Sequence, residues 1–287
     1  MAQEVKEAYL RRLDLDAEPP SIDALQRLHR RHVERVPYET LWIHAGEGWG
    51  IDPADSVRRV ALEHRGGYCF HLNGALSELL AALGYEVTRH VGGVHGPDGP
   101  ADEALTNHLV LTVRGLPTDD NPDGTWYVDA GLGDALHDAL PLVAAEYEQT
   151  PWTLVLERTP DATADWHLTH DPHGGFTGMS WRSTPAHIDE FVERHVWLST
   201  SPDSKFVKVP TAQRRDESGV DVVRGLTLSR IDDGGSTSEV LLRRDDWFGA
   251  LAELFDLRFE SLSADTLDAL WTRLLAAHHA WEAAERP

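Results

Sequence analysis

Residues 65–73 read Arg65-Gly66-Gly67-Tyr68-Cys69-Phe70-His71-Leu72-Asn73, and they form the most informative segment of the chain. It holds the only cysteine among 287 residues, so Cys69 has no partner for an internal disulfide. A lone cysteine is either an apolar filler or a nucleophile, and free cysteine is among the most buried residue types. The placement of Cys69 between a glycine pair and a helix start favours the nucleophile.

Residues 70–83 have helical spacing, with leucines on one side and polar residues on the other, and Gly84 supplies a C-terminal stop. Cys69 is therefore expected at the N-terminus of this helix. The unpaired amides and the positive end of the helix dipole stabilise a thiolate there. Gly66 and Gly67 allow a sharp turn just before it.

A thiolate nucleophile needs a base, and the base needs a group that orients it. Residues 106–114 alternate between apolar and polar side chains, as in a half-buried strand, and His108 lies at the beginning of that strand. Residues 126–129 form a second, short strand whose last residue is Asp129, before the glycine-rich turn 130–133. If the two strands pair, His108 and Asp129 lie near one end of a sheet, and a Cys-His-Asp relay becomes geometrically reasonable.

The chain resembles the arylamine N-acetyltransferase family in five segments that cover most of it in the expected order. The segments are Arg65-Gly66-Gly67-Tyr68-Cys69-Phe70, the strand that opens with His108, Val128-Asp129-Ala130-Gly131-Leu132-Gly133, Val36-Pro37-Tyr38-Glu39-Thr40-Leu41, and Leu198-Ser199-Thr200-Ser201-Pro202-Asp203-Ser204-Lys205-Phe206.

The resemblance implies an α+β fold with a cysteine-protease-like Cys-His-Asp core. We expect an N-terminal helical bundle (1–85) carrying Cys69, a central β-barrel-like domain (86–195) carrying His108 and Asp129, and a C-terminal α/β lid (196–287).

The resemblance also implies ping-pong acyl transfer. Cys69 takes an acetyl or other short acyl group from coenzyme A, with acetyl-CoA as the cosubstrate, and passes it to an arylamine or hydrazine. His108 acts as general base and acid, and Asp129 orients it. Backbone amides near Cys69 are the expected oxyanion donors. Substrate contacts are assigned to four side chains, Phe70, Leu132, Tyr38 and Phe206.

Several positions depart from the family's pattern. His71 stands where relatives usually carry Glu, which replaces an anionic neighbour of the nucleophile with a neutral or cationic one. Leu132 stands where the family places a Phe in the amine pocket, so a wall that would stack on an arylamine is missing. Thr40 and His195 both replace Asn. These changes bear on the acceptor rather than on the three catalytic residues.

Two other functions stay open. Some proteins resembling this family are amide synthases that release or cyclise a polyketide or other acyl chain held on an acyl carrier protein. Leu132 favours this alternative, because replacing Phe by Leu opens space. The third hypothesis is a noncatalytic binder, against which the complete set of Cys69, His108 and Asp129 argues.

Composition indicates a soluble enzyme. The formal net charge is −22, which disfavours binding to nucleic acid or to anionic membranes. No apolar run of about 18 residues and no signal peptide pattern occur, so we expect a cytoplasmic protein. The 16 histidines include no H-E-x-x-H spacing, and we expect no metal. The sequence does not determine the oligomeric state.

Periodicity changes along the chain. Helices are expected at 22–36, 55–63 and 266–280, the last with an apolar stripe that we interpret as core packing. Strands are expected at 87–94, 108–113, 126–129, 152–156, 166–169 and 178–183, near 220–231, and at 240–242. Residues 232–236 are expected to form a hairpin loop.

Overall fold

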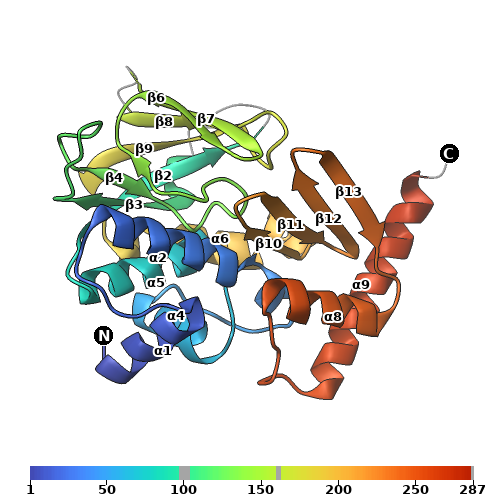
Figure 1. Cartoon of the computed structure of the whole chain (residues 1–287). Coiled ribbons are helices and arrows are strands. Elements are labelled where there is room, and N and C mark those ends of the chain that lie inside the picture. The colour runs from blue at the N-terminus through green and yellow to red at the C-terminus, as the bar shows by residue number, and fades with distance from the viewer. Residues whose placement is uncertain (97–103, 160–162, 286–287) are drawn as a thin grey trace.

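The computed structural model describes residues 1–96, 104–159 and 163–285. Figure 1 shows a group of helices at the N-terminal end beneath a curved sheet, with a second sheet and two long helices beside them. The helices near the N-terminus are α1 (Gln3–Leu13), α2 (Ile22–Arg35), α3 (Leu41–His44), α4 (Pro53–Leu62) and α5 (Cys69–Ala82).

Two of these helices begin at side-chain caps that the sequence encodes. The Ser21 hydroxyl accepts a hydrogen bond from the Ala24 amide at the start of α2. Asp52 caps α4 in the same way, and Pro53 occupies its first position. Both caps satisfy amides that have no partner within the helix.

Helix α5 runs through the centre of the helical part. Of its residues only Glu78, Ala81 and Ala82 are not buried. Leu72, Leu76 and Leu79 are fully buried against α1, α2 and α4. A helix that is apolar nearly all round is held by packing on every side, and this fixes Cys69 at its first position.

The curved sheet has eight strands in the order β5-β4-β3-β2-β9-β8-β7-β6, with every neighbouring pair antiparallel. The Tyr147 hydroxyl on one edge strand donates a 3.2 Å hydrogen bond to the Pro141 carbonyl on the other edge strand, so the barrel is nearly closed. The strands are β2 (Glu86–His95), β3 (His108–Arg114), β4 (Trp126–Val128), β5 (Leu140–Pro141), β6 (Ala145–Gln149), β7 (Trp152–Arg158), β8 (Trp166–Thr169) and β9 (Gly178–Pro185).

The second sheet joins the two ends of the chain. Its order is β1-β10-β11-β12-β13, and β1 comes from the N-terminal region, where Tyr38 pairs with Gln213. The strands are β1 (Tyr38–Glu39), β10 (Thr211–Arg215), β11 (Gly219–Arg224), β12 (Thr227–Asp232) and β13 (Gly235–Val240).

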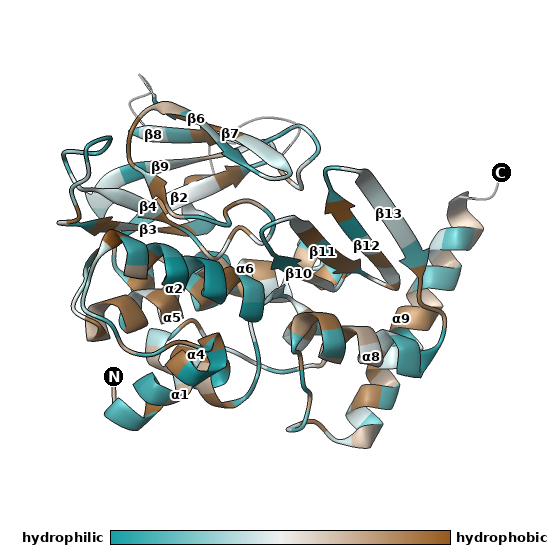
Figure 2. Cartoon of the chain, viewed as in Figure 1, coloured by the Kyte–Doolittle hydropathy of each residue, from teal (hydrophilic) through white to brown (hydrophobic). Residues whose placement is uncertain are grey.

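The remaining helices lie between and beyond the sheets. They are the 3₁₀ turns η1 (Ala104–Thr106) and η2 (Ile188–Phe191), and α6 (Val192–Thr200), α7 (Lys205–Lys208), α8 (Arg244–Phe255) and α9 (Ala264–Glu285). On α9, Leu270 and Leu274 are buried against a core that includes Trp247 and Leu251 of α8. In Figure 2 hydrophobic segments of α8 and α9 lie where the two helices meet. The apolar stripe is therefore core packing, as predicted.

The structure confirms the α+β fold and most of the expected elements. The hairpin loop is confirmed, since β12 ends at Asp232 and β13 begins at Gly235. The predicted strand at 240–242 is wrong: β13 ends at Val240 because the chain turns there toward α8. Neither α1 nor β1 was expected, and β1 is only two residues long, too short to show a hydrophobic periodicity.

Candidate active site

Cys69 is the first residue of α5 and is 4% exposed. The loop before it packs tightly: a Cβ on Gly66 would lie 1.9 Å from the Pro37 carbonyl oxygen, and Gly67 has a φ of +134°. Both positions therefore require glycine. The pair lets β1 run against the loop, where the Glu39 amide bonds to the Gly67 carbonyl.

His108 and Asp129 form a buried ion pair. The His108 Nε2 atom lies 2.7 Å from the Asp129 Oδ2 atom. Their strands pair in the expected antiparallel sense, with Leu111 opposite Val128, although Asp129 lies one residue beyond the end of β4. Strand pairing thus brings together two residues that are 21 positions apart.

The electrostatics of this pair favour the charged forms. Burial alone would lower the pKa of His108, but the charge of Asp129, followed by the neighbouring Cys69, raises the pKa to about 10. Burial alone would raise the pKa of Asp129, yet the charge and hydrogen bond of His108 and the hydrogen bond from Asn73 hold it below its usual value. His108 is consequently an imidazolium beside the sulfur at neutral pH.

The Asp129 carboxylate accepts three further hydrogen bonds. They come from the Asn73 side-chain amide (2.7 Å), the Tyr127 hydroxyl (2.8 Å) and the Gly131 backbone amide (2.9 Å). The Asp129 amide in turn donates to His29 Nε2 at 3.3 Å. The carboxylate is therefore fixed in position and in its ionised form.

Sequence reasoning missed these supporting residues. Asn73 follows Cys69 by one helical turn, and Tyr127, on β4, precedes Asp129 by two residues. The spacing of four in a helix places Asn73 on the same side as Cys69, and the spacing of two in extended chain places Tyr127 on the same side as Asp129. These spacings were the sequence signal that could have identified both residues. His29 is 100 residues from Asp129, and no local pattern connects them.

Cys69 is enclosed by backbone on two sides. Its Sγ atom lies 3.5 Å from the Asn107 carbonyl oxygen, just before His108. A Cβ on Gly131 would lie 2.6 Å from the Cys69 Cα atom. Gly131 is thus required for the turn after Asp129 to approach the nucleophile.

His71 is a neutral, structural neighbour of the nucleophile. Its Nδ1 atom accepts a 3.3 Å hydrogen bond from the Tyr68 amide, which caps α5. Burial, followed by the charge of Arg59 and by His195, holds the pKa of His71 well below its usual value. The ring packs edge-on against Trp42 and Trp49.

His195 completes the same buried cluster. Its Nε2 atom lies 2.8 Å from the Trp49 carbonyl oxygen and its Nδ1 atom 2.5 Å from the Tyr68 hydroxyl. Burial lowers the pKa of His195, so the neutral ring donates to Trp49 and accepts from Tyr68. His195 thereby connects α6 to the residue preceding Cys69.

The four residues assigned to substrate binding occupy different surroundings. Tyr38 and Phe206 contact each other edge to face at 6.3 Å between ring centroids, and Phe206 also contacts Tyr68 at 5.2 Å. Phe70 is fully buried against Phe191. Leu132 is 7% exposed and packs in the barrel core. Phe70 thus lies in the hydrophobic cluster of Cys69, against which Tyr38 and Phe206 pack, whereas Leu132 lies in the separate core of the barrel.

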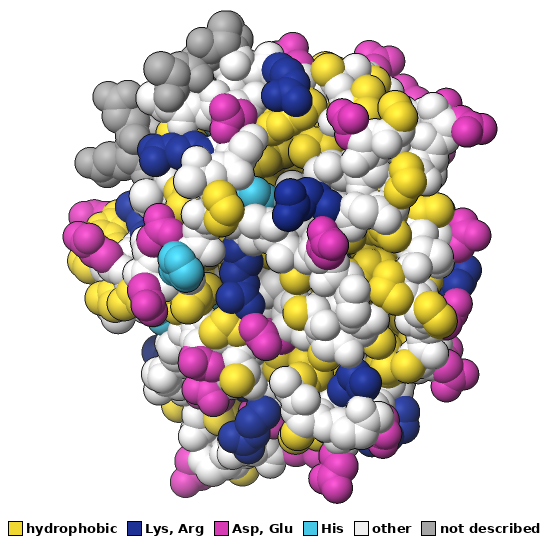
Figure 3. Space-filling view, turned by 90° about the vertical axis from the view of Figure 1, so that its left-hand side faces the viewer, with side chains coloured by type: hydrophobic (Ala, Val, Ile, Leu, Met, Phe, Trp, Pro, Cys, Tyr) yellow, Lys and Arg dark blue, Asp and Glu magenta, His cyan; other side chains and the backbone are white. Residues whose placement is uncertain are grey.

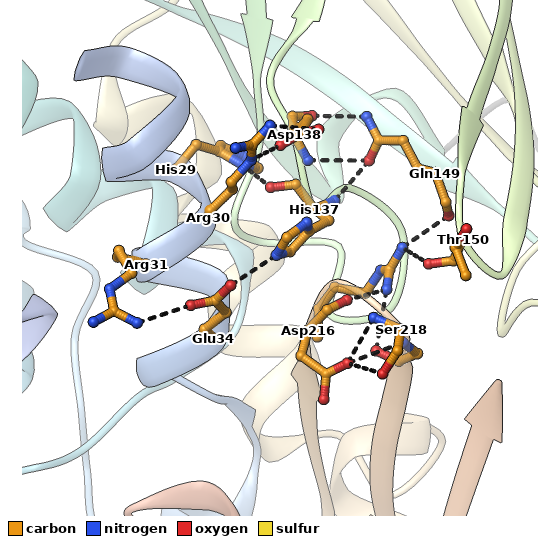
Figure 4. Close-up of polar contacts among 12 residues, drawn as sticks. His29, Arg30, Arg31, Glu34, His137, Asp138, Gln149, Thr150, Asp216 and Ser218 are labelled. Atoms are coloured by element: carbon orange, nitrogen blue, oxygen red, sulfur yellow. Dashed lines mark hydrogen bonds and ion pairs between the residues drawn. The ribbon is translucent and has the colours of Figure 1, made fainter. Parts of the chain in front are cut away.

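Helix α2 is tied to the segment that follows the catalytic turn. Figure 4 shows His29, Arg30 and Glu34 of α2 reaching the 137–138 backbone and side chains, and Gln149 holding the same segment from the barrel. Because His29 also accepts from the Asp129 amide, α2 and the barrel both position the catalytic turn.

Neither a metal-binding group nor a membrane-spanning helix is found in the described part of the chain. No group of three or more His, Cys, Asp or Glu side chains there is arranged to hold a metal ion. None of the helices described is long and apolar enough to cross a membrane. On the face in Figure 3, basic side chains stand singly or in small groups among acidic ones.

Comparison with known proteins gives a consistent answer. The model of a family described as N-acetyltransferase matches residues 21–263. The pineal gland arylamine N-acetyltransferase isozyme NAT-3 of Gallus gallus is 28% identical over 232 residues, which cover 75% of this chain and 78% of the relative. Arylamine N-acetyltransferase 1 of Homo sapiens is 26% identical, over 78% of this chain and 82% of the relative.

Solved structures agree with the sequence relatives. The arylamine N-acetyltransferase of Nocardia farcinica superposes with a TM-score of 0.80 at 30% identity, over 94% of this chain and 95% of that one. The Mycobacterium marinum enzyme, solved in complex with CoA, has the same fold, with a TM-score of 0.81 at 23% identity over 94% and 98% of the two chains. Since the matching family model spans most of the sequence, this chain belongs to the arylamine N-acetyltransferase family and is an acyltransferase.

Proposed function

We propose that the protein moves an acetyl group from acetyl-CoA to an arylamine or hydrazine through an acyl-cysteine intermediate. The observation that carries the proposal is the His108–Asp129 pair of 2.7 Å next to Cys69 at the start of α5. Family membership and the CoA complex of the Mycobacterium marinum relative support the choice of donor.

In the first half-reaction the Cys69 thiolate attacks the thioester carbonyl carbon. The new S–C bond forms, the bond to the coenzyme A sulfur breaks, and that sulfur leaves as a thiol with the proton of His108. Because His108 Nε2 is held by Asp129, Nδ1 is the nitrogen that delivers the proton. Exchange of one thioester for another has little thermodynamic cost.

In the second half-reaction the amine nitrogen attacks the acyl carbon. His108 Nδ1, now neutral, takes the proton that the amine loses, the C–N bond forms, and Cys69 leaves as the thiolate. Asp129 stabilises the imidazolium that results and keeps Nε2–H directed toward itself. The enzyme returns to its starting ion pair.

We assign stabilisation of the tetrahedral oxyanion to the first amides of α5. The initial amides of a helix have no intrahelical acceptor and lie at the positive end of its dipole. The His71 and Leu72 amides both bond to the Tyr68 carbonyl, which leaves the Cys69 and Phe70 amides as the candidates. They are adjacent to the reacting carbon.

Acceptor recognition is assigned to the side of Cys69 where Tyr38 and Phe206 meet. Their edge-to-face contact offers an aromatic surface for a flat amine. Leu132 and Phe70 are proposed to shape this region from behind, since both are almost fully covered.

An amide synthase that takes its acyl chain from a carrier protein is the second candidate. The observation that favours it is Leu132, an aliphatic side chain in the catalytic turn between Gly131 and Gly133, where it cannot stack on an arylamine. Replacing Leu132 by Phe is expected to shift preference toward flat aromatic amines. Unchanged selectivity would remove Leu132 from the acceptor site.

The deciding experiment is intact mass spectrometry after incubation with acetyl-CoA and no amine. We expect one added acetyl group on the protein and none on the Cys69→Ala variant, whose fold is checked by circular dichroism. Addition of an arylamine should discharge the acetyl group as the amide. A protein that stays unmodified while Cys69 is still alkylated by iodoacetamide would contradict acetyl-CoA as donor and support a carrier-bound chain.

A further inference from the structure

A cavity of about 490 Å³ lies between α1, α2, β10 and the end of α8. In Figure 1 α1 and α2 lie on one side of it and α8 on the other. None of the three catalytic residues lines it. Its arginines come from four separate parts of the chain, and they are Arg11, Arg12, Arg31, Arg35, Arg214 and Arg258.

The lining is basic in a strongly acidic protein. Six arginines face three carboxylates, Glu34, Glu253 and Asp256, while the whole chain has a net charge of −22. Two carboxylates outside the lining neutralise part of this charge. Asp14 pairs with Arg31 and with Arg35, and Asp221 pairs with Arg214. Glu34 and Asp256 also pair with Arg31 and Arg258. Six arginines thus lie among five carboxylates, whereas the whole chain has 48 acidic and 26 basic residues.

Arg12 supplies the more specific observation. This side chain is only 7% exposed. Its Nη1 atom donates to the carbonyl oxygens of Val60 and Arg65. Its Nε and Nη2 atoms are buried without a hydrogen-bond partner, a state that is unfavourable and rare in folded proteins.

The nearest carboxylate does not satisfy these donors. The Asp256 Oδ2 atom lies 4.0 Å from Arg12 Nε, beyond hydrogen-bonding distance. The same oxygen is already 2.7 Å from His64 Nδ1. Burial lowers the pKa of Arg12 to about 10, although Asp256, Tyr9 and Glu39 act in the opposite direction. Among the described residues, no oxygen accepts a hydrogen bond from Arg12 Nε or Nη2, beside a cavity that Arg12 lines together with five other arginines.

We propose that this cavity binds an oligophosphate, either inorganic or carried on a nucleotide. Phosphate oxygens match the paired N–H groups of arginine, and a cavity of this volume accommodates a ligand of nucleotide size. None of the three residues proposed to carry the reaction lines this cavity, and the proposal does not depend on the acetyl-transfer assignment.

The test is isothermal titration calorimetry of the full chain with tripolyphosphate, ATP and citrate at low ionic strength. We expect tripolyphosphate and ATP to bind with one site per chain and citrate at least tenfold more weakly. ATP that binds more tightly than tripolyphosphate identifies a nucleotide, and equal affinities identify the phosphate chain alone. Citrate binding as tight as tripolyphosphate, or no binding at millimolar tripolyphosphate, overturns the proposal.

Variants separate this cavity from general attraction by charge. Arg12→Met is unsuitable alone, because Arg12 also holds two carbonyls. The double variant Arg11→Gln and Arg258→Gln removes two exposed lining charges and is expected to weaken tripolyphosphate at least tenfold. The control double variant Arg27→Gln and Arg243→Gln makes the same charge change outside the cavity and should bind like the parent protein. Equal losses in both would overturn the proposal.

Competition with the acyl donor gives an independent criterion. We expect saturating acetyl-CoA to leave tripolyphosphate affinity unchanged, because the cavity lining includes no catalytic residue. Displacement of tripolyphosphate by acetyl-CoA would place the phosphate in the donor site and contradict a separate cavity. Failure of the acetyl-transfer proposal would alter none of these binding results.

Discussion

At the scale of single residues, the fixed point of the catalytic centre is Asp129. Four donors converge on one buried carboxylate, from α5, β3, β4 and the following turn. Hydrogen bonds to a charged group are worth about 1.5–3 kcal/mol each. These bonds fix the carboxylate that orients His108.

Removing the Asn73 donor tests this arrangement. In Asn73→Ala the pKa of Asp129 is expected to rise, because one hydrogen bond that lowers it is lost. The acid limb of the pH–rate profile should move to higher pH, and kcat should fall about 10- to 100-fold, which corresponds to one such bond. Ser77→Ala on the same helix is the control, and it should keep the parent profile.

Titration of His108 predicts a pH dependence of stability. An unfolded histidine loses its proton near pH 6.5, whereas the ion pair keeps the folded pKa near 10. The pair's contribution is therefore fully present below about pH 6.5 and is lost as the pH rises toward 10. This group alone gives a slope of up to about 1.4 kcal/mol per pH unit within that window.

Urea unfolding between pH 6.5 and 9.5 measures the slope. Asp129→Asn removes the main charge that raises the pKa of His108, so the variant should lose most of this pH dependence. An Asp129→Asn slope equal to that of the parent protein would show that His108 is not held as an imidazolium.

At the scale of elements, Arg215 is the residue that joins the two sheets. It lies at the end of β10 and is 1% exposed. Its guanidinium donates to five carbonyls, in the segment after the catalytic turn, in the β6–β7 turn and in the β10–β11 turn. Figure 4 shows part of this network near Gln149, Thr150 and Ser218.

Arg215→Met is expected to destabilise the protein by about 3 kcal/mol or more, because several buried carbonyls lose a charged donor at once. Thermal unfolding followed by circular dichroism measures the loss. Arg224→Met, at the exposed end of β11, should change the midpoint little. Similar midpoints for the two variants would argue against a joining role for Arg215.

At the scale of the whole molecule, the net charge of −22 acts on an anionic cosubstrate. The protein's field repels coenzyme A at long range, and salt screens that repulsion over about 10 Å at 0.1 M. The KM for acetyl-CoA is therefore expected to fall severalfold between 10 and 200 mM salt. A KM that rises with salt would reveal local attraction stronger than the global field.

Much of the geometry of the candidate site could be predicted because its signals are local. Cys69 is marked by a glycine pair and a helix start, and the pairing of β3 with β4 follows from two adjacent alternating segments. The residues that bond to Asp129 also differ in whether a local sequence pattern marks them. Asn73 and Tyr127 had a usable spacing, whereas His29 reaches Asp129 only through tertiary packing.

The parts that could not be predicted depend on contacts between distant segments. β1 is two residues long and exists because β10 pairs with it 173 positions later, at Glu39 and Ala212. Arg215 reads as an ordinary strand arginine in the sequence, yet its donors end on carbonyls as far back as Ala135. Neither the β1–β10 pairing nor the Arg215 hydrogen bonds produce a hydrophobic periodicity or a motif in the sequence.

The insertion of β1 into the second sheet has a consequence for engineering. β1 pairs with β10 and is also hydrogen-bonded to the loop that precedes Cys69, through the Glu39 amide and the Gly67 carbonyl. The C-terminal portion is thus not an exchangeable cassette: grafting it from a relative would also have to graft a matching β1. Chimeras joined before Pro37 take β1 and β10 from the same parent and should retain activity. Chimeras joined near residue 200 take β1 and β10 from different parents, so the pairing next to the Cys69 loop would be mismatched.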